Sequence, residues 1–149
     1  MFKRILAALD GSQLAEYVLP YVLDLAGRFR SQVHLVTVTN TTEEGLGLGR
    51  AFEAYLAHLG EKLKNSGAAV KTALLSGNPS EKILDYATEK KIDLIAITTI
   101  GKGGPGRWKL GSVAEKLSTA SAVPVLLVPT NNSAGAPSGP FFTRILVPV

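Results

Sequence analysis

Short apolar runs alternate with amphipathic segments along most of the chain. The runs occupy residues 5–9, 33–38, 70–75, 94–97 and 125–128, and uninterrupted apolar stretches of this length are typical of strands covered on both faces. The segments between them repeat apolar residues at helical spacing, as Phe52, Leu56, Leu59 and Leu63 do on one face of the second helix. This alternation predicts βα units, and therefore a parallel sheet of five strands with helices on both faces.

Turn and capping residues follow the first run. Asp10, Gly11 and Ser12 end it, and Ser12 is a residue that can cap the next helix. Pro20 lies inside that helix, where a proline is expected to kink it or to remove one hydrogen bond. The buried face of the helix is predicted from four residues at helical spacing, namely Val18, Val22, Leu25 and Phe29.

The order of the elements predicts where a ligand binds. Gly67 is placed to end the second helix, and Asn78 followed by Pro79 predicts the start of the third. Right-handed crossovers between five successive strands predict a doubly wound sheet of flavodoxin-like type, with strand order 3-2-1-4-5. Such sheets bind ligands beyond the carboxyl ends of the strands, where the order reverses. The turn at Asp10 and the loop 99–110 both follow strands at that edge.

Composition narrows the classes of function. Of 149 residues, 46% are hydrophobic and 19% charged, as in a folded globular domain. The absence of cysteine excludes disulfides, thiolate metal sites and cysteine nucleophiles. His34 and His58 have no partner at metal-ligand spacing, so both are predicted to be structural and no metal site is expected.

Charge and hydropathy indicate the compartment and the kind of partner. The net charge of +4 fits ordinary solubility or an anionic small ligand, and no basic motif interleaved with aromatic residues indicates nucleic acid. No apolar run is long enough to cross a membrane, and the run after the basic N-terminus stops at Asp10, too early for a signal peptide. The cytoplasm is therefore the expected compartment.

The loop 99–110 is the best candidate for a functional site. It is rich in glycine and contains Lys102, Arg107 and Lys109. Glycines let backbone amides approach phosphate oxygens, basic side chains neutralise phosphate charge, and a helix starting at Ser112 adds a partial positive charge. The alternative is a surface loop with solvated charges. Literal matches to the dinucleotide and P-loop patterns are set aside, because Pro105 interrupts the first and the second lacks its lysine.

Four features together resemble the universal stress protein family over residues 1 to about 130. They are a hydrophobic strand entering Asp10-Gly11-Ser12, the sequence Gly77-Asn78-Pro79, the long glycine loop, and the segment from Gly111-Ser112-Val113 to the strand 125–128. The resemblance implies a flavodoxin-like fold of the adenine nucleotide alpha hydrolase-like type.

The nucleotide-binding branch of that family has the pattern Gly-x2-Gly-x9-Gly-Ser/Thr. Aligned on Gly111 and Ser112, its second glycine is Gly101, whereas Thr98 stands at the first glycine position. A side chain therefore occupies a position where the family brings backbone near the nucleotide, although its hydroxyl could meet a phosphate or ribose.

Carried over by position, the resemblance implies a site for ATP or a related adenine nucleotide, with magnesium only as a companion of the phosphates. Asp10 is implied near the adenine and ribose, and Val38 against the adenine. From the residues alone, Asp10 is also a common turn residue, Val38 also core, and Ser112 also a helix cap. The implied nucleotide-binding residues are Ala8, Asp10, Val38, Thr98, Gly101, Lys102, Gly111, Ser112 and Val113.

Two functions of different classes fit these residues. The first is an ATP-binding stress-response sensor or regulator, with little or no turnover because no general base is evident, so that it is at most a weak ATPase. The resemblance also implies a homodimer through the last strand, Val125 to Val128. The second is a protein–protein interaction module that binds no nucleotide, and Thr98 supports it.

Residues 131–149 are predicted to lead into a second copy of the domain. Residues 131–140 are rich in Ser, Asn, Gly and Pro and are interpreted as a linker. Residues 141–149 are interpreted as the first strand of a truncated repeat, because Arg144-Ile145-Leu146 echoes Arg4-Ile5-Leu6. The domain itself is expected over residues 1–130. A second domain would pair with the last strand in place of a second chain, and the alternative is a chance likeness of a short terminal strand.

Overall fold

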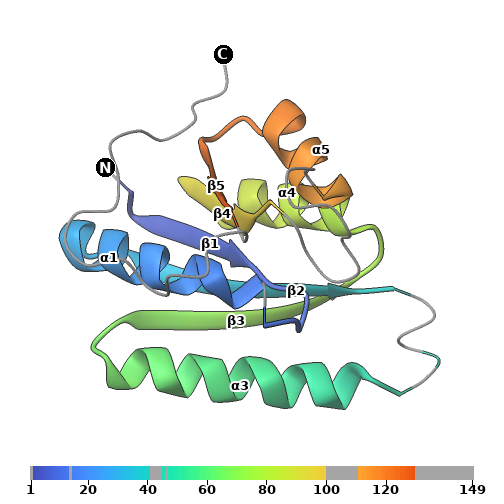
Figure 1. Ribbon diagram of the computed structural model, residues 1–149, viewed down its shortest axis with the longest axis horizontal. Coiled ribbons are helices and arrows are strands. Elements are labelled where there is room, and N and C mark those ends of the chain that lie inside the picture. The colour runs from blue at the N-terminus through green and yellow to red at the C-terminus, as the bar shows by residue number, and fades with distance from the viewer. Residues whose placement is uncertain (1, 14, 41–44, 46, 100–110, 130–149) are drawn as a thin grey trace.

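A five-stranded parallel sheet forms the centre of the fold (Figure 1). The computed structural model describes residues 2–13, 15–40, 45, 47–99 and 111–129. Its sheet has the order β3-β2-β1-β4-β5, which confirms the predicted strand order. Every predicted run coincides with a strand to within one residue. The strands are β1 (Arg4–Ala8), β2 (Gln32–Thr39), β3 (Ala69–Ser76), β4 (Leu94–Thr98) and β5 (Val125–Val128).

Helices cover both faces of the sheet, as Figure 1 shows. On one face lie α1 (Leu19–Phe29) and α3 (Gly49–Asn65), and on the other α4 (Pro79–Glu89) and α5 (Ser112–Ala120). Successive residues of a strand point to opposite faces, so Ile5 and Ala7 join the core under α1 and α3, whereas Leu6 and Ala8 join the core under α4 and α5. The continuous apolar runs are therefore explained by two hydrophobic cores, one on each side.

The expected kink at Pro20 was wrong. A separate 3-10 turn, η1 (Ala15–Val18), precedes α1, and the helix itself begins at Leu19. Pro20 thus lies in the first turn, where the missing N–H would have had no partner within the helix, so the proline costs no hydrogen bond. Ser12 acts as a cap, but of η1, because its Oγ accepts a hydrogen bond from Ala15 N at 3.2 Å.

The predicted buried face of the first helix was right except at its end. Val18, Val22 and Leu25 are buried, but Phe29 is 39% exposed. Its ring meets the edge of Phe2, with ring centroids 5.4 Å apart, beyond the amino-terminal end of β1. Phe29 is the last residue of α1. It lies beyond the end of the sheet, whereas the other three residues pack against the sheet.

The predicted helix boundaries at Gly67 and Asn78 are confirmed. Gly67 has a φ of +100° two residues after α3 ends, a conformation that glycine adopts without strain. Asn78 is the N-cap of α4, and its side chain accepts a hydrogen bond from Glu81 N at 3.1 Å, with Pro79 at the first helical position. Across the described ranges, no helix is both long and apolar enough to cross a membrane. The proposed linker and repeat, residues 131–149, lie outside the described residues.

Candidate functional site

The start of α5 meets the carboxyl end of β4 at the point where the strand order reverses. Gly111 N donates to Thr99 O at 2.5 Å, and Thr99 N donates to Val128 O at 3.0 Å. Gly111 is the N-cap of α5, and having no side chain it leaves the helix without a side-chain cap. No side chain of the described residues caps the first amides of α5, and these amides lie beside the end of β4, where they are suited to an anion. Gly101 and Lys102 lie outside the described residues.

The turn after β1 holds Asp10 at the same edge. Asp10 Oδ1 accepts from Ser12 N at 2.9 Å and from Ser12 Oγ at 2.6 Å. The same Ser12 Oγ accepts from Ala15 N, so one hydroxyl joins the Asp10 carboxylate to η1. The prediction that Asp10 is a turn residue is confirmed. Its hydrogen bonds hold the carboxylate in one orientation beyond the end of β1.

Two side chains of α3 lie against the turn after β1 and the η1 helix that follows it. Gly11 has a φ of +86°, and a Cβ added there would lie 2.8 Å from Phe52 Cε1. One turn further along α3, Tyr55 OH donates to Glu16 Oε2 at 3.0 Å. Burial, followed by the Glu16 hydrogen bond and the negative charges of Glu16 and Asp10, raises the pKa of the Tyr55 hydroxyl. The apolar pattern of α3 placed Phe52 on the inner face, but nothing in the sequence pointed to Tyr55 and Glu16.

Three of the predicted apolar positions come together on the α4–α5 side of the sheet. Ala8 is buried in that core, and Val38 and Val113 are partly buried against it. Thr98, the last residue of β4, is only 3% exposed and lies opposite Val128 in the sheet register. The Thr98 side chain is therefore buried inside the fold and not exposed at the carboxyl edge of the sheet.

The two histidines have different surroundings. His34 is 2% exposed, and its Nδ1 lies 2.6 Å from Tyr86 OH and its Nε2 2.9 Å from Gln32 Oε1. Burial, and then the positive charges of Lys71, Arg4 and Lys90, lower the pKa of His34 to about 4. His58 is exposed on α3. Within the described part of the chain, no three His, Asp or Glu side chains group as metal ligands would.

Comparisons with known proteins show the family and support the fold. Residues 1–129 match the universal stress protein family. Universal stress protein MJ0531 of Methanocaldococcus jannaschii is 31% identical over 140 residues, which cover 86% of this chain and 82% of that one. The solved structure of protein MJ0577 superposes with a TM-score of 0.81 at 28% identity, covering 89% and 99% of the two chains. A universal stress protein solved in complex with cAMP shares the fold, with a TM-score of 0.69, 21% identity and coverage of 87% and 98%.

Proposed function

The chain belongs to the universal stress protein family, and on that premise we propose that it binds an adenine nucleotide, ATP in the first instance, at the carboxyl edge of its sheet. We further propose that it acts as a stress-response sensor or regulator with little or no turnover. The residues of the site support the binding proposal. The hydrogen bonds that connect the site to the edge of the sheet support the regulatory proposal.

The uncapped start of α5 is the observation that carries the binding proposal. A helix N-terminus has unpaired amides and a partial positive charge, which together favour phosphate. Gly111 offers no side chain to use those amides, and Ser112 is exposed at the first helical position. Phosphates placed there would receive N–H groups from the backbone, and magnesium would enter only with them.

The neighbouring residues suit the rest of an adenine nucleotide. Asp10, oriented by Ser12, supplies a carboxylate that can accept hydrogen bonds from ribose hydroxyls. Val38 and Val113 are partly buried against the same apolar core as Ala8, and a flat base could lie against their exposed atoms. The cAMP found with a structural neighbour has the same base and sugar, which supports an adenine nucleotide as the class of ligand.

Hydrogen bonds connect this site to the edge of the sheet. Thr99 accepts from Gly111 N and donates to Val128 O, at the end of the edge strand β5. We propose that a second copy of the chain pairs along β5, since β5 pairs with β4 alone among the described strands and an unpaired strand edge is a ready site for pairing. Nucleotide binding at α5 would then affect the pairing surface through the two hydrogen bonds of Thr99. A change in pairing is how such a regulator would signal that the nucleotide is bound.

Thr98 supports the second candidate, an interaction module that binds no nucleotide. A buried threonine stands at the position of the first glycine of the family pattern. In that case the β5 edge would be the functional surface and the start of α5 only a structural feature.

A charge placed at the start of α5 tests the binding proposal. Ser112→Glu should remove ATP binding, because a carboxylate there repels phosphate, while the fold is kept because acidic residues stabilise helix N-termini. Ser112→Gln is the matched control, of similar size and no charge, and should bind ATP within a few-fold of the wild type. Calorimetric titration measures both. Equal ATP affinity in the two variants would place the site elsewhere.

A further inference from the structure

Thr98 faces the side of the sheet away from the proposed contacts of the base. It lies opposite Val128 in the register of β4 and β5, and Val128 belongs to the core under α1 and α3. Ile97, one residue earlier, belongs to the core under α4 and α5, and successive residues of a strand point to opposite faces. Both observations place the Thr98 side chain on the α1 face, whereas the predicted apolar contacts of the base lie on the α5 face.

The short helix η1 lies against the end of β4 on the α1 face. The two elements are in contact, and the buried residues of η1, Ala15 and Val18, are in the same core as Val128. Continuing the register of β1 and β4 by two residues places Leu9 beside Thr98. Because Thr98 is only 3% exposed, its side chain fills the space between η1 and the ends of these strands.

The Ser12 hydroxyl joins η1 to the Asp10 turn. Its Oγ donates to Asp10 Oδ1 and accepts from Ala15 N, the first residue of η1. A shift of η1 would therefore move Ser12. The carboxylate that is proposed to accept hydrogen bonds from the ribose hydroxyls would move with it.

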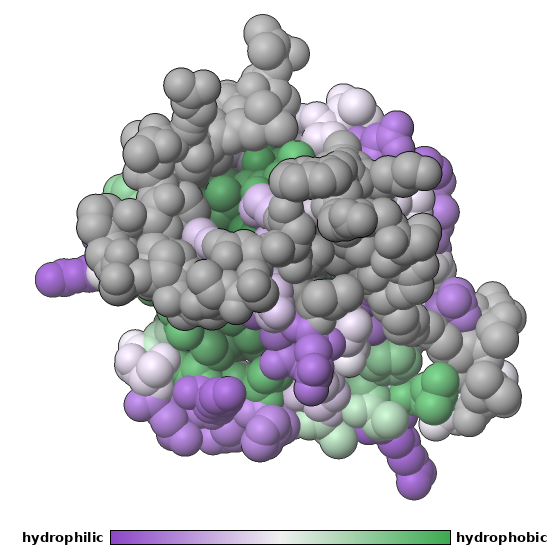
Figure 2. Space-filling model, in the orientation of Figure 1, coloured by the Kyte–Doolittle hydropathy of each residue, from purple (hydrophilic) through white to green (hydrophobic). Residues whose placement is uncertain are grey.

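A second support of η1 and the turn comes from α3. Tyr55 OH donates to Glu16 of η1 at 3.0 Å, and Phe52 lies close to Gly11. Both aromatic residues are in the first two turns of α3, whereas the far end of that helix, on the left of Figure 2, has a hydrophilic surface. The turn is thus held by the start of α3 on one part and by the end of β4, with Thr98, on another.

We infer that Thr98 is a positioning residue of the proposed nucleotide site. Its side chain packs against η1, and η1 holds the Asp10 carboxylate in place through Ser12. The inference rests on the proposed function and refines it, because the residue at the first glycine position then aids nucleotide binding. Removal of the side chain should weaken ATP binding if Thr98 supports the turn, and should strengthen it if Thr98 obstructs the nucleotide.

Calorimetric titration of ATP into Thr98→Gly and Thr98→Ala measures that sign. We expect both variants to bind ATP about tenfold more weakly than the wild type, as for the loss of one hydrogen bond to a charged group. Ser12→Ala cuts the connection between η1 and Asp10, so Thr98→Ala should cause no further loss in that background. The inference is overturned if either Thr98 variant binds ATP as tightly as the wild type or more tightly, or if the losses from Thr98→Ala and Ser12→Ala add.

Hydrogen exchange in the absence of nucleotide tests the support of η1 without reference to ATP. The amides of Ala15 and Glu16 donate to Ser12 Oγ and to Gln13 O. Thr98→Ala should reduce the protection of both amides, because η1 can then open locally. Unchanged protection in this variant would overturn the inference.

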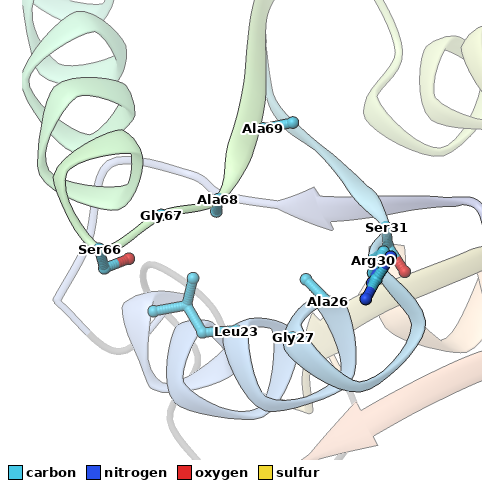
Figure 3. Close-up of a pocket in the computed structure, with 9 residues that line it drawn as sticks. All are labelled: Leu23, Ala26, Gly27, Arg30, Ser31, Ser66, Gly67, Ala68 and Ala69. Atoms are coloured by element: carbon cyan, nitrogen blue, oxygen red, sulfur yellow. The ribbon is translucent and has the colours of Figure 1, made fainter.

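Ala26→Gly is the control for a general loss of stability. Ala26 lies near the far end of α1, where it lines a cavity away from η1 (Figure 3), and glycine there destabilises the helix. This variant should keep the protection of the two η1 amides and the ATP affinity of the wild type. An equal loss in Ala26→Gly and Thr98→Ala would overturn the inference. If the wild type binds no ATP, the proposed function fails, whereas a loss of protection confined to Thr98→Ala would still show that Thr98 supports η1.

Discussion

Protonation of His34 should destabilise the fold in mild acid. The ring lies between β2 and α4, where Gln32 Oε1, which can only accept, faces Nε2 and the Tyr86 hydroxyl faces Nδ1. Nε2 therefore carries the proton of the neutral ring, and Tyr86 donates to Nδ1. A second proton would enter at Nδ1, where it would stop Tyr86 from donating to that nitrogen and would place a positive charge in a buried site already facing Arg4, Lys71 and Lys90.

The size of this effect follows from the pKa of His34. It is about 4 in the fold and about 6.5 in an unfolded chain. Because the folded value is the lower one, the unfolded chain binds a proton between pH 6.5 and pH 4 that the folded chain does not. The contribution of His34 to stability is therefore complete above pH 6.5, falls as the pH falls, and levels off below pH 4. The full loss is about 3 kcal/mol, and most of it has occurred by pH 4.5.

Urea unfolding at pH 7.0 and 4.5 measures this loss in the wild type and in His34→Gln. The glutamine variant should be less stable at neutral pH, but it has no imidazole to titrate. Other groups contribute equally to both proteins, so the wild type should lose about 2 kcal/mol more than the variant between the two pH values. An equal loss in the two proteins would refute the reasoning and place the acid sensitivity in other groups.

Two further predictions concern the support of the Asp10 turn. Gly11→Ala should lower the free energy of unfolding by about 1–2 kcal/mol or more, because it combines a positive φ with a contact to Phe52. Thermal unfolding measures this loss of stability. In the Phe52→Leu background, Gly11→Ala should keep the cost of the backbone strain but lose that of the contact. An unchanged unfolding midpoint in Gly11→Ala would show that the turn relaxes without strain. Tyr55→Phe should cost about 1–2 kcal/mol through the lost hydrogen bond to Glu16. In a double-mutant cycle with Glu16→Gln in urea, a coupling energy of zero would contradict that contact.

The elements of this fold were predictable because their signals are local. Each strand is a continuous apolar run covered on both faces, and Asn78 caps its helix through an amide three residues away. Pro20 was misjudged because the apolar period runs unbroken from η1 into α1, so the pattern did not show where one ends and the other begins.

Contacts between distant residues could not be predicted. Tyr55 and Glu16 are 39 positions apart, and His34 and Tyr86 are 52 apart, so neither pair leaves a mark in any short window of sequence. At the candidate site, the strand order alone brought the Asp10 turn and the start of α5 to one edge. The orientation of the Asp10 carboxylate by Ser12, and the burial of Thr98, needed the folded chain.

Titration of ATP into the purified protein tests the central claim most directly. The protein is first unfolded and refolded to release any nucleotide that it carries, and the released material is identified by chromatography. We expect an adenine nucleotide in that material, or saturable binding of ATP that Ser112→Glu abolishes. No released nucleotide and no binding at millimolar ATP would contradict it, and would leave the protein as an interaction module.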